Sequence, residues 1–285
     1  MQTQPPTQAL QGATATLLLT LAARARAGDM ADMADMPAFD DPQARRIAAA
    51  LPLDLSGYAA DAAFVRSVVV RALLFDRYAA EFLAAHPTGL CISLGAGLCT
   101  RRSRLAAVAG AAAAGARWLN VDLPDAISLR EQYMPRAEEE DNLACSLLDA
   151  AWLDTAGLPG DRPVLVMLEG VCPYLPQAPL EAVLRRLAER FARGGPPCSV
   201  VLDHVHPALA RLPMQVGGMH LPVVSGFEDA AGLARIHPSI RVMSEEHPYA
   251  QFSQQHLLFE TAFHATTGAR PYAVVRLALG SQDDA

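Results

Sequence analysis

The sequence lacks several features that would assign it to a class at once. It has no C-x-x-C pair, and its five cysteines are widely spaced and odd in number, which argues against a zinc site or a disulfide framework. Its longest apolar runs carry charges within about 18 residues, so we expect no membrane-spanning helix. It has no block of basic residues and a net charge of −7, so nothing indicates a nucleic acid as its partner.

The N-terminal residues lack the basic stretch and apolar run of a secretory signal, so we expect no signal peptide. We therefore interpret the cysteines as reduced, mostly buried thiols of a cytoplasmic protein. Hydrophobic residues make up 52% of the chain and charged residues 19%, which predicts a sizeable buried core. This composition fits an acidic enzyme, monomeric or homodimeric, that takes up small molecules.

Helical patterns come first along the chain, and an alternation of strands and helices follows. The expected N-terminal helices cover residues 10–28, 42–50 and 61–85. Short apolar runs then predict strands at residues 90–95, 117–121, 143–147, 163–168, 198–203, 256–263 and 272–278. Helical patterns separate the first five of these strands, at residues 101–114, 124–136, 150–157 and 177–193.

This alternation predicts an α/β fold with a parallel sheet and helices on both of its faces. The last two expected strands have no clear helix between them, so we expect them to form an antiparallel pair. Proline and glycine crowd residues 207–238, which predicts a loop-rich insertion. Long insertions in compact domains tend to form lids or binding loops.

Residues 90–100, LCISLGAGLCT, have the pattern of a strand, a glycine turn and the start of a helix. Gly95 and Gly97 carry no Cβ, so a ligand can approach the backbone closely at this turn. The helix that follows directs its free N–H groups toward the same place. A turn of this kind also serves simply to reverse a chain, so the residues that follow it have to decide between the two roles.

Carboxylates follow three later strands, at the edge where ligands of open α/β sheets bind. Asp122 ends the second strand and is suitably placed for ribose hydroxyls; its alternative role is to cap the helix that starts at Pro124. Asp149 follows the third strand and is placed either to accept from an adenine amino group or to cap a helix. Glu169 follows five apolar residues, and because a buried carboxylate is costly unless hydrogen-bonded, we favour a functional role for it.

The fifth strand ends in the sequence Asp203-His204-Val205-His206. Two histidines beside an aspartate are compatible with a metal site or with a general base. The sequence shows no third converging ligand, so we favour one histidine lining a substrate cavity over a metal centre.

Three classes of nucleotide-binding protein could account for this set of residues. A dinucleotide dehydrogenase normally has a third glycine after Gly95 and Gly97, where this chain has Arg101 or its neighbours. A P-loop NTPase needs a Gly-Lys-Ser/Thr end, which is absent from the sequence. A Rossmann-type methyltransferase needs a glycine turn, an acid for the ribose and a polar group at the adenine of S-adenosylmethionine, and the sequence supplies all three.

Six segments carry a further signal when they are taken together. They are FDDPQA (39–44), VVVRALLFD (68–76), SLGAGLCTR (93–101), VDLPD (121–125), LLDAAW (147–152) and LEGVCPYLP (168–176). In this order they resemble the leucine carboxyl methyltransferase family, including its bacterial polyketide O-methyltransferases. The resemblance implies a Rossmann-like class I methyltransferase with a seven-stranded, mostly parallel sheet and an antiparallel last strand. It also implies a helical cap over residues 1–88 and a core over residues 89–285, with a lid insertion at about 205–250.

The resemblance also implies roles for individual residues. In the family, the arginine of an R-x-x-x-x-D segment binds the methionine carboxylate of S-adenosylmethionine; that position is Arg71, and a guanidinium can grip a carboxylate bidentately. Tyr174 matches a tyrosine near the methyl-transfer site. The other implied cofactor contacts are Gly95, Ala96, Gly97, Asp122, Leu123, Leu148, Asp149 and Glu169. The chain departs from the family at Cys99, where Asp is usual, and at Cys172-Pro173.

The implied reaction is methyl transfer from S-adenosylmethionine to an oxygen of a small molecule, with S-adenosylhomocysteine as product and no metal. The expected acceptor is a carboxylate, or a phenol or hydroxyl, of a secondary-metabolite intermediate. A carboxylate is already ionised near neutral pH, whereas a hydroxyl needs a base, for which His204 or His206 is the candidate. The two departures leave an alternative open, a repurposed member that binds the cofactor and assists a reaction without transferring methyl.

Overall fold

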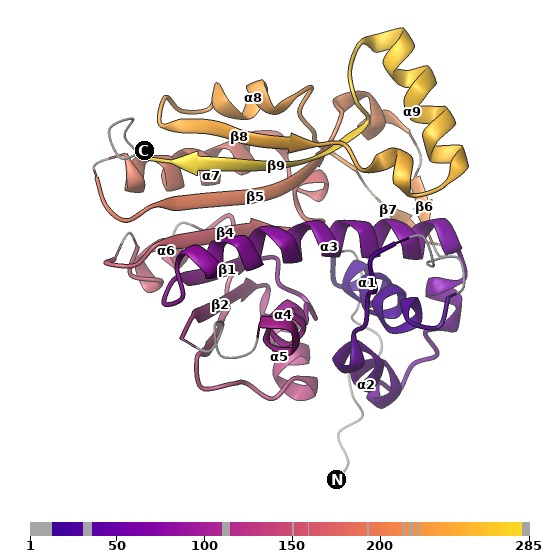
Figure 1. The fold of residues 1–285 in the computed structure, drawn as a ribbon, viewed down its shortest axis with the longest axis horizontal. Coiled ribbons are helices and arrows are strands. Elements are labelled where there is room, and N and C mark those ends of the chain that lie inside the picture. The colour runs from indigo at the N-terminus through magenta and orange to yellow at the C-terminus, as the bar shows by residue number, and fades with distance from the viewer. Residues whose placement is uncertain are drawn as a thin grey trace.

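Within the residues that the structure describes, three α-helices precede the first strand of the sheet and pack together. The computed structural model describes residues 13–30, 36–109, 115–149, 151–158, 160–192, 194–212, 214–216, 219–221 and 223–280. The N-terminal elements are α1 (Ala13–Ala27), α2 (Pro42–Ala50), the 3-10 turn η2 (Ser56–Ala59) and α3 (Ala62–Ala85). Figure 1 shows α3 running along one face of the sheet, and α1 contacts both α2 and α3. Residues 10–12, 110–114, 150 and 193 of the expected helices lie outside the described residues.

One seven-stranded sheet has the order β3-β2-β1-β4-β5-β9-β8. Its strands are β1 (Leu90–Leu94), β2 (Arg117–Asp122), β3 (Glu140–Ala144), β4 (Val164–Leu168), β5 (Cys198–Val205), β8 (Ile240–Glu246) and β9 (Tyr272–Leu279). Neighbours among β1 to β5 pair in parallel, whereas β9 is antiparallel to both β5 and β8. The predicted α/β fold with a mostly parallel sheet is therefore confirmed. A separate hairpin is formed by β6 (Met214–Val216) and β7 (Met219–Leu221).

The connecting helices cover both faces of the sheet (Figure 1). They are α4 (Arg101–Ala109), α5 (Pro124–Tyr133), α6 (Ala151–Thr155), α7 (Gln177–Phe191) and α8 (Ala230–Ala234). Helix α9 (Gln254–Thr267) connects β8 to β9 and lies beyond the ends of these strands (Figure 1). One hydrophobic core lies between the sheet and α6, α7 and α8, and a second lies between the sheet and α3. The parallel crossovers return the carboxyl ends of β1 to β5 to one edge, where side chains from distant segments can meet. No helix in the described ranges has the length and hydropathy needed to cross a bilayer.

The predicted strand at residues 256–263 is wrong, because these residues lie within α9. A short apolar run has the same pattern in a strand and in a buried helix, so the pattern alone did not decide between them. The side chain of Ser253 caps the N-terminal end of α9, and Gly268 ends the helix in the left-handed conformation. The antiparallel partners of β9 are instead β5 and β8, and β8 lies in the range expected for the lid.

A cluster of buried charges ties the N-terminal helices to α4. Asp41 is 1% exposed and caps α2 by accepting a hydrogen bond from the Ala44 N–H at 2.9 Å. Its Oδ2 also accepts from Arg24 Nε at 3.2 Å, from Arg104 at 3.0 Å and from the Thr100 hydroxyl. Burial alone would raise the pKa of Asp41, but Arg24 and Arg104 hold it below its usual value. The carboxylate is therefore ionised in the folded protein.

We expect Asp41→Asn to lower the free energy of unfolding by about 3 kcal/mol at pH 7, because two buried arginines lose their shared counter-charge. The folded-state pKa of Asp41 is depressed, so the stability that it contributes is present above its unfolded pKa of about 4 and is lost as pH falls further. Urea denaturation of wild type and variant at several pH values should show a difference that shrinks on acidification.

The matched control is Asp40→Asn, which removes the exposed neighbouring carboxylate that pairs with Arg45 at the surface. This variant is expected to change the free energy of unfolding by less than about 1 kcal/mol. Equal losses in the two variants would contradict a specific contribution from Asp41.

Candidate active site

A cavity of about 380 Å³ lies at the carboxyl ends of β1, β2 and β4. Residues from α1 and α3 line its other side, so the N-terminal helices cover the edge of the sheet. This volume is within the range of about 300–1,000 Å³ that is usual for small-molecule sites. The cavity is therefore where the residues predicted from the strand ends can be compared.

The glycine turn after β1 forms part of the cavity wall. Gly95 has φ +72° and Gly97 has φ +45°, a left-handed conformation that strains any residue with a side chain. A Cβ at Gly95 would also lie 2.5 Å from the Val171 side chain. Arg130 holds the turn from behind by donating to the carbonyl oxygens of Gly97 and Cys99 at 3.2 and 2.9 Å. The turn thus leaves only backbone and the small Ala96 side chain beside a ligand.

Asp122 ends β2 and lines the cavity, as does Leu123. Its Oδ2 accepts from the Gly97 N–H and its Oδ1 from the Leu123 N–H, both at 2.7 Å. Helix α5 begins after Leu123 without a side-chain cap, so Asp122 braces the glycine turn and does not cap that helix. Burial raises the pKa of Asp122, while the two backbone N–H groups oppose the shift. Each oxygen retains a lone pair that can accept from a ligand hydroxyl.

The structure places Asp149 differently from the prediction. β3 occupies residues 140–144 instead of 143–147, so Asp149 lies well past the strand end. It is exposed and accepts from the Ala151 N–H at 3.0 Å at the start of α6, which is the capping alternative. The cavity is lined instead by Ser146, Leu147 and Leu148. Ser146 is the polar side chain at this place. It was not predicted, because the expected strand extended to residue 147 and so included Ser146.

Glu169 follows β4 and lies between two arginines. Its Oε1 accepts from Arg71 Nε at 3.3 Å, and its Oε2 accepts from Arg101. Arg101 in turn donates to Asp76 at 2.8 Å. Burial alone would raise the pKa of Glu169, but Arg101 and Arg71 lower it to about 2. The predicted functional carboxylate is therefore ionised and charge-paired at the cavity wall.

Arg71 projects from α3 to the cavity, where Tyr174 also lies. Its guanidinium lies 3.6 Å from Asp203 as well as beside Glu169. A Cβ at Gly170 would come within 3.0 Å of this guanidinium, and Gly170 has φ +64°, so the glycine makes room for the arginine. Burial alone would lower the pKa of Arg71, but the two carboxylates raise it. Burial raises the pKa of Tyr174.

These contacts belong to one chain of eight side chains whose charges alternate. In order, the members are Arg24, Asp41, Arg104, Asp76, Arg101, Glu169, Arg71 and Asp203. The protein contains no lysine, and the planar fork of an arginine can bridge two carboxylates where an ammonium group offers one point of charge. Three members with cationic side chains, Arg24, Arg71 and Arg101, line the cavity.

Neither His204 nor His206 lines the cavity. Successive side chains of a strand point to opposite faces, so Asp203 faces Arg71 while His204 packs edge-on against Phe227 in the core below α7 and α8. Burial lowers the pKa of His204 to about 4. His206 starts the turn after β5 and packs against Phe263 of α9. In the described part of the chain, no three His, Cys, Asp or Glu side chains converge to hold a metal ion.

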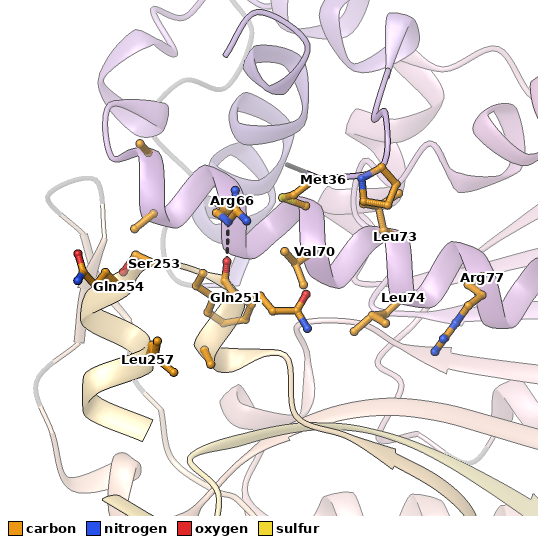
Figure 2. A pocket seen from close by; sticks show the side chains of 15 residues that line it. Met36, Arg66, Val70, Leu73, Leu74, Arg77, Gln251, Ser253, Gln254 and Leu257 are labelled. Carbon is orange, nitrogen blue, oxygen red and sulfur yellow. Dashed lines mark hydrogen bonds between the residues drawn. The ribbon is translucent and has the colours of Figure 1, made fainter. Parts of the chain in front are cut away.

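The opposite side of α3 borders a second, open groove of about 990 Å³. Figure 2 shows Val70, Leu73 and Leu74 of α3 on one side of it and residues near η6 (Tyr249–Gln251) and the start of α9 on the other. Arg66 bridges the two sides by donating to the Gln251 carbonyl oxygen at 2.5 Å. The groove and the cavity share no lining residue, so α3 separates two hollows.

Comparison with known proteins agrees with this architecture. A Thermobifida fusca protein provisionally described as a methyltransferase superposes with a TM-score of 0.53 over 92% of this chain and 94% of its own, at 12% identity. The chain therefore has a Rossmann-like α/β fold, with the cavity at the carboxyl ends of its parallel strands. Residues 18–188 match the family model for leucine carboxyl methyltransferase. The chain belongs to that family, and it is an S-adenosylmethionine-dependent methyltransferase.

Two curated relatives support this assignment. The tetracenomycin polyketide synthesis O-methyltransferase TcmP of Streptomyces glaucescens is 33% identical over 70% of this chain and 68% of its own length. The S-adenosyl-L-methionine-dependent methyltransferase dpfgK of Gibberella zeae is 32% identical over 65% of this chain and 64% of its own. The alignments therefore span about two thirds of each relative, and they confirm the family resemblance seen in the sequence.

The ion pairs of Glu169 predict how the free energy of unfolding depends on pH in the acidic range. Its pKa is about 2 in the folded protein and about 4.3 when unfolded, so the stability it contributes is present above pH 4.3 and is lost as pH falls toward 2. Glu169→Gln should therefore flatten the decline of the free energy of unfolding in this acidic range. Glu81→Gln, which removes a half-exposed carboxylate, should keep the wild-type slope. Parallel pH profiles for wild type and Glu169→Gln would argue against the strong pairing.

Proposed function

We propose that this enzyme is an O-methyltransferase whose acceptor is the carboxylate of a small organic acid. The observation that carries the proposal is the set of side chains around the cavity, which includes neither histidine nor lysine among the residues described there. A hydroxyl acceptor requires a general base poised near neutral pH. A carboxylic acid is already ionised at that pH and can accept a methyl group without one.

The acidic side chains of the cavity are poorly suited to removing a proton. Arg101 and Arg71 hold the pKa of Glu169 at about 2 despite its burial, so it is a weak base. Burial raises the pKa of Asp122, but both of its oxygens accept backbone N–H groups that favour the ionised form, and the proposal assigns them to the ribose hydroxyls. Burial raises the pKa of Tyr174, so its phenolate is scarce at neutral pH. These states support an acceptor that arrives ionised.

The kinds of side chain around the cavity support binding of S-adenosylmethionine. Asp122 would accept from the ribose hydroxyls beside the glycine turn, and Ser146 with its apolar neighbours would receive the adenine. Glu169 and Arg71 present an anion and a cation side by side, which matches the ammonium and carboxylate of an amino acid. When bound, the cofactor supplies a methyl group on a positively charged sulfur. Because that group is already activated, the proposed reaction requires no metal ion.

The main task of the protein is then to position the acceptor and the cofactor and to exclude water. Helices α1 and α3 would hold the acceptor in line with the methyl group and keep solvent out, which favours a transfer that neutralises opposite charges. The new C–O bond forms as the C–S bond breaks, and the acceptor carboxylate becomes a methyl ester. We include in this proposal the capping role predicted for residues 1–88 and the lid role predicted for residues 205–250, apart from β8, which belongs to the sheet.

The relatives suggest the kind of acid. One is described as an enzyme of tetracenomycin polyketide synthesis, so we propose a polyketide-like acid of secondary metabolism as acceptor. The test is to incubate the purified protein with S-adenosylmethionine labelled in its methyl group and a panel of aromatic and polyketide acids. The label should enter a product that releases methanol in mild base. Carboxamide analogues of the same acids should remain unlabelled.

Two results would overturn this proposal. Label in a base-stable ether would show a hydroxyl acceptor, and cofactor binding without S-adenosylhomocysteine release across the panel would favour the repurposed alternative.

Cofactor affinity provides a second test of the site. Asp122→Ala should weaken S-adenosylhomocysteine binding by about tenfold or more, because hydrogen bonds to a charged group are lost. Arg71→Ala should have an effect of similar size through the methionine carboxylate. Asp125→Ala removes an exposed carboxylate three residues later on α5 and should leave affinity unchanged. Titration calorimetry measures all three; unchanged affinity in the first two variants would disprove the site assignment.

A further inference from the structure

Asp203 is a carboxylate at the carboxyl end of β5 that the reaction described above does not use. It is 1% exposed, and a buried carboxylate has to be paired and hydrogen-bonded to be tolerated. It faces α3, on the opposite side of the strand from His204. The groups that contact the Asp203 carboxylate therefore indicate its role.

Three groups converge on Asp203, and they come from three different elements. Its Oδ1 accepts from the Gly170 N–H at 2.6 Å, and its Oδ2 accepts from the Tyr272 hydroxyl at 2.9 Å. The same Oδ2 lies 3.6 Å from a terminal nitrogen of Arg71. Tyr272 is close because β9 pairs with β5 at this end of the strand. Asp203 thus connects the last strand, the loop after β4 and helix α3.

These contacts fix two parts of the proposed cofactor site at once. The Arg71 guanidinium is held at Nε by Glu169 and at a terminal nitrogen by Asp203, which restrains rotation of the fork. The Gly170 N–H belongs to the residue that follows Glu169, so the bond to Asp203 also fixes the loop that carries Glu169 and Tyr174. Asp203 itself is not among the residues that line the cavity.

We propose that Asp203 is a positioning residue for the amino-acid end of the cofactor. Through Arg71 it orients the donors that would bind the methionine carboxylate, and through Gly170 it sets the place of Glu169. Tyr272 supports this role by fixing the Asp203 carboxylate. The inference rests on the cofactor site proposed above. It means that β5 contributes to that site through Asp203, and not through His204 or His206.

The test compares two ligands in the full-length protein. S-adenosylhomocysteine carries the amino-acid end, whereas 5′-methylthioadenosine has the same nucleoside and thioether without carboxylate or ammonium. Asp203→Asn should weaken S-adenosylhomocysteine binding by about tenfold, the usual order for a charge-assisted contact. Binding of 5′-methylthioadenosine should remain within about twofold, since the nucleoside end does not depend on Arg71. Asp203→Glu, which keeps the charge, should restore part of the lost affinity.

Two further variants separate positioning from general stability. Tyr272→Phe removes only the hydroxyl that Asp203 accepts, and it should cause a smaller loss with the same selectivity for S-adenosylhomocysteine; this variant keeps the test decisive if Asp203→Asn does not fold. Glu260→Gln removes another buried carboxylate, which lies on α9, pairs with Arg270 and does not line the cavity. It should leave both affinities unchanged.

Equal losses for both ligands in Asp203→Asn and Tyr272→Phe would show a merely structural role, and no loss for either ligand would show no role. Both results overturn the inference. Failure of the underlying cofactor site is distinguishable, because the wild-type protein would then bind S-adenosylhomocysteine no more tightly than 5′-methylthioadenosine.

Discussion

Charge burial is the constraint on which the rest of this structure depends. Four arginines and four carboxylates alternate from Arg24 on α1 to Asp203 on β5, and most of them are withdrawn from water. An isolated buried charge is strongly destabilising, whereas a paired and hydrogen-bonded one is tolerated. The helices and strands that carry these side chains can therefore come together only as a set, with α1, α3 and α4 docked on the carboxyl edge of the sheet.

The same constraint shapes the cavity. Arg71 and Glu169 lie inside the alternating chain and also at the cavity wall, so groups that stabilise the fold present opposite charges to a ligand. A zwitterionic amino-acid group can join such a series without leaving an unpaired charge. The proposed cofactor site would use this property, and the same pairing with arginines lowers the pKa of the cavity carboxylate Glu169.

Most of the fold was readable from the sequence up to β5, because alternating apolar runs and helical patterns reflect parallel crossovers directly. The prediction was wrong at α9 and at the bounds of β3, and it left β8 inside the range of the lid. At α9 the run from His256 to Phe263 has no periodicity that separates helix from strand, and at β3 the strand boundary moved by three residues. The second error is small, but the end of a strand decides which side chains reach the edge of the sheet. The prediction therefore placed Asp149 at the cavity, where the structure has Ser146.

The sequence by itself indicated the class of protein and the glycine turn, because these signals lie within short segments. It also singled out Arg71, Asp122 and Glu169, which the structure brings together at the wall of one cavity. The tertiary structure alone decided which partners the charges take, since Arg71 and Glu169 are 98 residues apart in the chain. It also decided that β5 turns Asp203 toward α3 and His204 into the opposite core. Two adjacent polar residues look equivalent in a sequence, but the pleat of a strand sends them to opposite faces, and only the packed helices show which face holds the site.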